Sequence, residues 1–445
     1  MRIVVVGCGT AGASAAFAAR MLNRNASITV IGDEEQPTYS RCALPFAIAQ
    51  RLPLENIITF PEKRFARAKI ELLKPAVAEE IDTQRCAVRY RFEGAEKEAP
   101  FDALIYAAGG YAAVPKIDGA DLDGNYVLRT YNDAARLISI AKAGMTAVVN
   151  GASFVALEVA EALKQRGLNV HLIVRSRPLR SFLDEPLSAQ VKWHLESCGI
   201  VVHQGAEIER LEGGDRVSAV VVGGERLGCD FVVHAVGTRA RVELARAAGL
   251  KIGKTGAVWT DSKLRTSAGV VYAAGDCAEV EECVAGQRVV SALGTVAMRH
   301  GMVAGRNAVG AEQNATPFVR ATVMRLFGLE IGSVGLTEAQ AKNAGIDVAT
   351  AQVKHPALPH YWVENEDVTV RLVYEKKNGR IVGGQVMCRT GGALRVNILS
   401  VVVERRMSVY DLSVSDFCYS PPCADVWAPE AVCATAALRR LEAQK

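Results

Sequence analysis

The sequence predicts an α/β fold with two strand–turn–helix–strand units, followed by a C-terminal α+β domain. Two β-branched runs, Ile3–Val6 and 147–149, each lead into a turn of small residues, a helical pattern and a second apolar strand. From about residue 319 the pattern changes to alternating strands such as Thr369–Tyr374, and the turn at 377–380 indicates an antiparallel hairpin. The length of 445 residues suggests about three domains.

The first unit has the glycine pattern of a Rossmann-like dinucleotide-binding fold. Gly7-Cys8-Gly9-Thr10-Ala11-Gly12 follows the first strand, and an alanine-rich helix then extends to about Asn23. Gly7 permits the tight turn, Gly9 lets the backbone approach a pyrophosphate, and Gly12 lets the helix pack on the strand. The N-terminus of the helix then faces the phosphates. After the second strand, Ile28–Ile31, either Asp33 or Glu34 is expected to bind the ribose.

The second unit has a looser form of the same pattern. Its turn begins at Gly151, with Ser153 at the middle glycine position and Ala156 at the third, and both residues are small enough for a nucleotide site. A purely structural unit that binds no nucleotide is the alternative. Its second strand ends in Val174-Arg175-Ser176-Arg177, where an acid would select NADH, so the arginines could receive a 2′-phosphate. Both NADPH and NADH stay open. The residues expected to bind NAD(P)H are Gly151, Ser153, Phe154, Val155, Glu158, Arg175, Arg177 and Gly237.

A third strand ends in Gly275-Asp276 and looks like the second FAD motif of flavoproteins that bind two dinucleotides. The resemblance implies that Asp276 hydrogen-bonds the ribitol of FAD. Two linker strands, 104–110 and 232–237, end in a similar A-x-G pattern. The residues expected to bind FAD are Gly7, Gly9, Thr10, Ala11, Gly12, Asp33, Glu34, Arg41, Ala108, Gly109, Gly275 and Asp276.

Cys42 is the candidate redox residue. It follows the first nucleotide unit by the length of one βαβ unit, which would place its thiol beside a flavin. Because Pro45 fits the first turn of a helix, Cys42 is expected at a helix N-terminus, where N–H groups stabilise a thiolate. The alternative is a small, inert, buried side chain.

Bulk composition excludes other classes. The net charge of +4 is spread along the chain, which argues against a nucleic-acid partner. No run approaches the roughly 18 apolar residues of a membrane span. The eleven cysteines form no regular disulfide framework, and we therefore expect a cytoplasmic protein.

Together these features resemble the FAD- and NAD(P)H-dependent pyridine nucleotide-disulfide oxidoreductases. Position 47, five after Cys42, is alanine, which disfavours the two-cysteine classes. The segment 42–46 looks like the C-x-L-P-[YF] element of coenzyme A disulfide reductases, NADH oxidases and NADH peroxidases. The segments 335–338 and 419–422 are similar to the C-terminal dimerisation domain of that group. The resemblance implies a homodimer with an FAD domain at 1–112 and 245–318, an NAD(P)H domain at 113–244 and a dimerisation domain at 319–445.

The resemblance also implies an activity. A hydride passes from NAD(P)H to the flavin, which then opens a mixed disulfide between Cys42 and a small disulfide or persulfide, such as coenzyme A disulfide. The oxidases and peroxidases of the group carry a histidine where this chain has Thr10, which favours disulfide reduction. An NADH oxidase or peroxidase that cycles Cys42 through sulfenic acid stays open. A flavin-dependent ferredoxin-type reductase, which needs no thiol, and a non-enzymatic flavoprotein stay open as well.

Further roles follow from the resemblance and from departures from it. Tyr419 and Tyr361 of one subunit would reach Cys42 of the other and protonate a departing thiolate. Arg41 stands where asparagine is usual, and it could lower the thiol pKa or bind an anionic substrate. Cys418 or Cys423 could form a second redox pair with Cys42, and Cys433 follows nearby. The spacing of these three cysteines fits no zinc template, so no metal site is expected.

Overall fold

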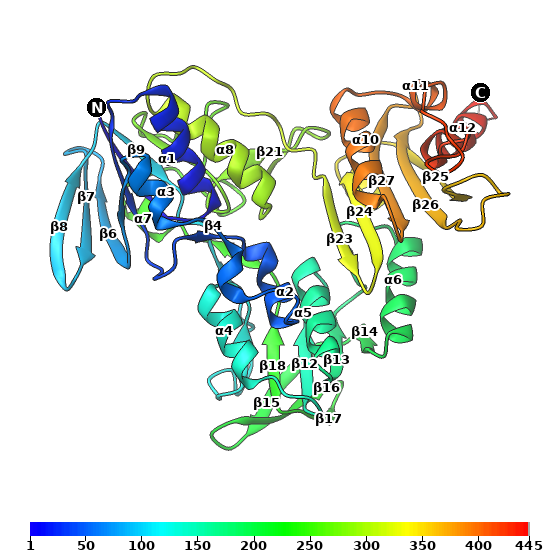
Figure 1. The fold of residues 1–445 in the computed structure, drawn as a ribbon, viewed down its shortest axis with the longest axis horizontal. Coiled ribbons are helices and arrows are strands. Elements are labelled where there is room, and N and C mark those ends of the chain that lie inside the picture. The colour runs from blue at the N-terminus through cyan, green and yellow to red at the C-terminus, as the bar shows by residue number, and fades with distance from the viewer. Residues whose placement is uncertain (444–445) are drawn as a thin grey trace.

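The computed structural model describes residues 1–443, which form three regions, each built on a five-stranded sheet (Figure 1). The fold class is the one that the sequence predicts. Two of the sheets are parallel, as the repeated βαβ pattern requires, and the third is antiparallel. No helix within residues 1–443 has both the length and the apolar character needed to cross a membrane.

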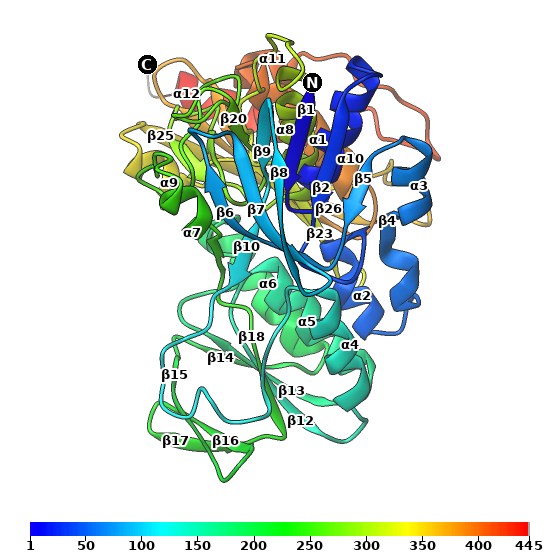
Figure 2. The ribbon, with the colours of Figure 1, turned by 90° about the vertical axis from the view of Figure 1, so that its left-hand side faces the viewer.

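The first sheet joins the N-terminal segment to a strand far along the chain. Its order is β20 (Val271–Ala273), β9 (Ala103–Tyr106), β1 (Arg2–Val6), β2 (Ser27–Ile31) and β5 (Glu71–Leu73). An antiparallel sheet of β6 (Ala76–Asp82), β7 (Ala87–Phe92) and β8 (Ala95–Pro100) stands in front of it in Figure 2. Smaller elements of this region are β3 (Thr38–Tyr39), β4 (Ile58–Phe60), α3 (Glu62–Arg67), α7 (Glu243–Ala247), β21 (Glu279–Glu281) and β22 (Arg288–Val290).

Two helices pack against each other beside this sheet. Helix α1 (Thr10–Leu22) is alanine-rich, and α8 (Gly294–Asn307) brings two glycines against it. A Cβ atom on Gly301 would lie 2.3 Å from the carbonyl oxygen of Ala11, and one on Gly305 would lie 2.1 Å from that of Ala15. The two helices can approach this closely because both contact faces are made of small residues.

The second sheet repeats the parallel design. Its order is β11 (Asn125–Val127), β18 (Phe231–His234), β12 (Thr146–Asn150), β13 (Asn169–Val174) and β14 (Val201–Gln204). The accompanying helices are α4 (Tyr131–Ile140), α5 (Phe154–Gln165) and α6 (Glu185–Ser197). The antiparallel sheet of this region has β15 (Ile208–Gly213), β16 (Val217–Val222) and β17 (Glu225–Gly228). The linkers β10 (Gly110–Ala112) and β19 (Thr238–Ala240) pair antiparallel between the first two regions.

The third sheet is antiparallel throughout, in the order β23 (Thr322–Leu326), β24 (Leu329–Gly335), β27 (Ile381–Cys388), β26 (Asp367–Glu375) and β25 (Val348–Pro356). The hairpin predicted around residues 377–380 is confirmed, because β26 and β27 pair with Tyr374 opposite Ile381. Its helices are α9 (Glu338–Asn343), α10 (Gly392–Glu404), α11 (Val409–Ser413) and α12 (Pro429–Glu442).

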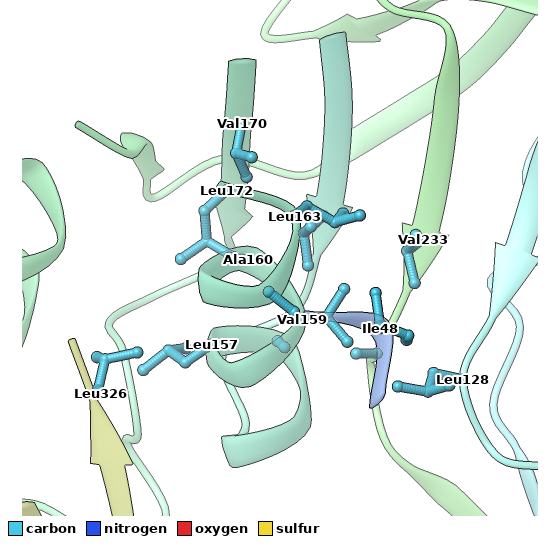
Figure 3. Packing of buried hydrophobic residues seen from close by; sticks show 14 of the residues in the cluster. Ile48, Leu128, Leu157, Val159, Ala160, Leu163, Val170, Leu172, Val233 and Leu326 are labelled. Carbon is cyan, nitrogen blue, oxygen red and sulfur yellow. The ribbon is translucent and has the colours of Figure 1, made fainter. Parts of the chain in front are cut away.

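The segment that carries Cys42 packs on the second region rather than on its own sheet. It forms a 3-10 turn at Arg41–Ala43 and the short helix α2 (Leu44–Ile48). In Figure 3, Ile48 of α2 lies beside Val159 of α5, and Leu326 of β23 meets the same helix at Leu157. Helix α5 is thus in contact with all three regions, and it holds the turn of Cys42 at the junction of the first two.

Candidate functional site

A cavity opens at the carboxyl ends of β1, β2 and β9. This is the edge at which open parallel sheets bind nucleotides. Eleven of the twelve residues that the sequence assigns to FAD line it, all except Gly12. Gly12 faces the backbone instead, because a Cβ there would lie 1.9 Å from the carbonyl oxygen of Gly7.

The glycine turn has the geometry that a pyrophosphate needs. Gly7 has φ +108°, and a Cβ there would lie 2.2 Å from the carbonyl oxygen of Ala107, so a side chain is excluded on both counts. Gly9 has open space where its Cβ would be, and α1 begins at Thr10 beside the cavity. The bare backbone at Gly9 and the N–H groups of α1 can receive a dinucleotide, and these residues therefore fit FAD.

Both candidate ribose acids line this cavity, and each has a cationic partner. The Arg41 Nη2 atom lies 2.5 Å from Glu34 Oε1, and the Tyr39 hydroxyl donates to Glu34 Oε2 at 2.5 Å. Arg241 Nη1 lies 2.5 Å from Asp33 Oδ2. Arg41 also donates to the carbonyl oxygen of Arg129 at 2.6 Å. Arg41 is therefore held in the wall of the cavity, and its guanidinium is already engaged with Glu34 rather than free for an anionic substrate.

Sequence reasoning missed Arg129, which comes from the second region. Its Nη2 atom lies 2.6 Å from Asp276 Oδ2, and its Nε donates to the carbonyl oxygen of Gly110 at 3.1 Å. The one sequence signal nearby is a capping box, in which the carboxylate of Asp133 accepts from the backbone N–H of Arg129 and of Thr130. That signal predicts a helix start and says nothing of the cavity.

Cys42 opens onto the first cavity. It lies in the 3-10 turn, one residue before Ala43, the N-cap of α2, and Pro45 is in the first turn of that helix as predicted. The expected lowering of the thiol pKa is not what the surrounding protein produces. Burial raises the pKa of Cys42, and the charges of Glu158 and Asp276 raise it further, while Arg129 opposes them.

A second cavity opens at the carboxyl ends of β12, β13 and β18. Its lining includes Gly151, Ser153, Arg175, Arg177 and Gly237. Gly151 has φ +143°, and a Cβ there would lie 2.4 Å from the carbonyl oxygen of Ala235. Ser153 is the N-cap of α5, and its hydroxyl accepts from the N–H of Ala156. These residues fit a second dinucleotide.

Three residues assigned to NAD(P)H do not line that cavity. They are Phe154, Val155 and Glu158, which all lie within α5. The ring of Phe154 stacks on Phe182 with centroids 4.4 Å apart. Glu158 instead borders a small recess beside Pro45 and Phe46 of α2, and burial raises its pKa to about 7. Glu158 therefore lies on the Cys42 side of α5.

The C-terminal candidates are not in the Cys42 cavity of their own chain. Tyr361 and Tyr419 are exposed, and their hydroxyl oxygens are 3.1 Å apart. Cys418 and Cys423 are exposed as well. Cys433 is fully buried in the core, and burial raises its pKa to about 12, so this thiol cannot exchange with Cys42 without local unfolding.

Two dinucleotide-binding folds in this arrangement are typical of flavin-dependent oxidoreductases that draw electrons from a pyridine nucleotide, and here a cysteine lies at the mouth of the first. Comparison with protein families agrees. Residues 1–301 match the pyridine nucleotide-disulphide oxidoreductase family, and residues 323–431 match its dimerisation domain. The chain belongs to this family and is an NAD(P)H-dependent oxidoreductase whose cofactor is FAD.

Named relatives match over almost the whole chain. An NADH oxidase of Methanocaldococcus jannaschii is 33% identical and is covered over 99% of both chains. A CoA-dependent NAD(P)H sulfur oxidoreductase of Pyrococcus furiosus is 33% identical over 96% of this chain and 97% of its own. The solved structure of a NAD-dependent persulfide reductase from A. fulgidus is 32% identical, with a TM-score of 0.96, over 100% of this chain and 84% of that one.

Proposed function

We propose that this enzyme reduces a low-molecular-weight disulfide or persulfide, such as coenzyme A disulfide, through Cys42. The observation that carries the proposal is the placement of an exposed thiol on the cavity that fits FAD. Cys8 also borders that cavity, but its side chain is less exposed than that of Cys42 and its sulfur lies 3.4 Å from the Thr38 hydroxyl. Cys42 is therefore the better placed nucleophile.

Residues of the first cavity would hold the cofactor in three places. The turn at Gly9 and the N-terminus of α1 would receive the pyrophosphate, Asp33 or Glu34 would bind the ribose, and Asp276 would bind the ribitol. When bound, FAD supplies two electrons that it has taken from NAD(P)H as a hydride. Within the described chain, Arg129 neutralises Asp276 and links the two nucleotide regions at this point.

The chemistry of Cys42 balances as a thiol–disulfide exchange. The thiolate attacks one sulfur of the substrate, forms a mixed disulfide and releases one thiol. Two electrons and a proton then release the second thiol and restore the thiolate. Tyr419 and Tyr361 of a partner subunit are proposed to protonate the departing sulfur, which makes a homodimer necessary for turnover. The hydrogen bond between the two phenols raises the pKa of Tyr361.

The first prediction tests Cys42 directly. We expect Cys42→Ser to retain FAD and its reduction by NAD(P)H but to lose disulfide or persulfide turnover by about a thousandfold or more, because serine cannot form the mixed disulfide. Steady-state NAD(P)H oxidation with coenzyme A disulfide and with a persulfide measures this. The control is Cys198→Ser, at the C-terminal end of α6 and outside both cavities. Unchanged turnover in Cys42→Ser would overturn the assignment.

The second candidate function is oxygen or peroxide reduction through a sulfenic acid at Cys42. It is favoured by the similarity to a relative named NADH oxidase. The same preparation, given oxygen or peroxide alone, distinguishes the two functions. Fast NADH consumption without any added disulfide would select the oxidase or peroxidase.

The exposed Cys418 and Cys423 are proposed as a second redox thiol that exchanges with Cys42 across the dimer. Non-reducing digestion and mass spectrometry of the oxidised enzyme test this. A peptide of Cys42 linked to the C-terminal segment supports the exchange, and complete absence of that peptide rejects it.

A further inference from the structure

The two nucleotide units of this chain end their second strands with opposite charges. After β2 come Asp33 and Glu34, whereas after β13 come Arg175, Ser176 and Arg177. In a βαβ unit of this kind the adenosine ribose lies at the end of the second strand, where an acid accepts from the 2′-hydroxyl. An acid there would repel a 2′-phosphate. The first unit therefore has the charge that suits an unmodified ribose, and the second has the charge that suits a phosphate.

The second cavity as a whole is cationic. Its lining includes one carboxylate, that of Glu207, and five basic side chains, those of Lys116, Arg175, Arg177, Arg180 and Arg239. Arg175 Nε lies 3.5 Å from Glu207 Oε1, and both side chains are mostly exposed, so this ion pair is weak. Within residues 1–443, Arg180 and Arg239 form no ion pair. These guanidinium groups are available to an anion.

The arginines of this loop have different roles. Arg177 Nη1 donates to the carbonyl oxygen of Leu183 at 2.7 Å, and burial lowers the pKa of Arg177. It therefore closes the loop 177–183 on itself. Arg175, which precedes this loop, and Arg180, which lies within it, are exposed and line the cavity. This differs from the sequence-based expectation, which paired Arg175 with Arg177 and left Arg180 out.

We propose that the second cavity selects NADPH over NADH, with Arg175 and Arg180 binding the 2′-phosphate and Arg177 holding their loop in place. The inference rests on the proposed function only in taking NAD(P)H as the electron donor. Guanidinium groups bind phosphate through paired, charge-assisted hydrogen bonds, and two such residues in the segment that follows β13 would distinguish the two nucleotides at the one position where they differ.

Binding of nucleotide fragments to the FAD-loaded enzyme tests the site without turnover. By isothermal titration calorimetry, adenosine 2′,5′-bisphosphate is expected to bind about 10- to 100-fold more tightly than 5′-AMP. In the double variant Arg175→Ala/Arg180→Ala this ratio falls to about one, while 5′-AMP binding is retained. Arg210→Ala is the matched control, an exposed arginine of β15 outside the cavity, and it keeps the ratio. Equal binding of the two fragments by the unmodified enzyme would overturn the proposal.

Anaerobic reduction of the bound flavin separates this inference from the proposed function. NADPH is expected to reduce the flavin at about tenfold or more lower concentration than NADH, and Arg175→Asp is expected to reverse the preference. If NADH is preferred and disulfide turnover persists, the selectivity is refuted while the proposed function stands. If neither nucleotide reduces the flavin, the proposed function fails, whatever the fragments show.

Discussion

The ionisation of the Glu158 carboxyl group affects the ionisation of the Cys42 thiol. Burial, with a contribution from Glu161, raises the pKa of Glu158 to about 7, so this side chain gains its negative charge near neutrality. After burial itself, the charge of Glu158 is the largest influence that raises the pKa of Cys42. The thiol therefore meets an additional barrier to ionisation as the pH rises above 7.

Removing that charge should make Cys42 more acidic. In Glu158→Gln the pKa of Cys42 falls, because a neutral amide no longer opposes the thiolate. The rate of Cys42 alkylation by iodoacetamide, followed from pH 6 to 10, measures this pKa. We expect the midpoint of the rate profile to move to lower pH, and below pH 7 the variant and the parent should differ little. The control is Glu55→Gln, outside the cavity, and an identical profile in Glu158→Gln would contradict the coupling.

The residues of the site differ in how visible they are in the sequence. The glycine turns and Cys42 belong to continuous motifs, in which the spacing along the chain carries the meaning. No continuous motif includes the three arginines Arg129, Arg180 and Arg241. The Arg129–Asp276 ion pair spans 147 residues, and only the packing of two regions brings its members together. A single sequence gives no signal for such a pair.

Helices α1 and α8 position the phosphate-binding turn through the contact at Gly301 and Gly305. In an isolated helix, alanine is favoured over glycine by about 1 kcal/mol. Here a Cβ on Gly305 would lie 2.1 Å from the carbonyl oxygen of Ala15, which is closer than any real contact. The helices must separate to accept it, and the N-terminus of α1 moves with them.

Gly305→Ala is therefore expected to destabilise the enzyme by about 1–3 kcal/mol despite its better helix propensity. Chemical denaturation measures the free energy of unfolding. The variant should also lose FAD more readily than the parent enzyme during gel filtration. Met298→Ala on the same helix, where the side chain is 44% exposed, serves as control and should change stability by less than about 0.5 kcal/mol. Greater stability of Gly305→Ala would show that the helix contact is looser than described.

At the level of elements, the sequence predicted the pieces that have a strong local signal. The strands β1, β2 and β12 and the end of helix α1 agree with the expected positions to within one or two residues, and β13 ends at Val174 as predicted. Helix α8 was not predicted, since its pairing with α1 depends on small residues that are ordinary in any helix. The five residues of α2 were predicted as a helix start but not as a contact with α5, because that contact is tertiary.

At the scale of the molecule, the order of the three regions was readable because the nucleotide pattern repeats and then gives way to alternating strands. The contacts between the regions could not be predicted from the sequence. One buried link between the second and third regions is a polar cluster around Asp184, the N-cap of α6, which is 4% exposed. Its carboxylate accepts from Arg371 Nε, from Gln385 Nε2 and from the backbone N–H of Glu338, at 2.8–2.9 Å. Nothing in the sequence around residue 184 distinguishes this aspartate from an ordinary helix cap.

This cluster should control both stability and the order of the cationic loop. Asp184→Ala leaves Glu338 as the only carboxylate paired with the Arg371 guanidinium. It also removes the acceptor of two buried donors, Arg371 Nε and Gln385 Nε2. We therefore expect a loss of about 3–5 kcal/mol in the free energy of unfolding. The loop that lines the second cavity ends at Asp184, and hydrogen exchange of residues 176–183 should therefore accelerate while the sheet around β1 is unaffected. The neighbouring exposed Glu185→Ala should cost no more than about 1 kcal/mol. If Asp184→Ala accelerates exchange equally in the β1 sheet, the aspartate stabilises the whole molecule rather than the junction, and the loop does not depend on the third region for its order.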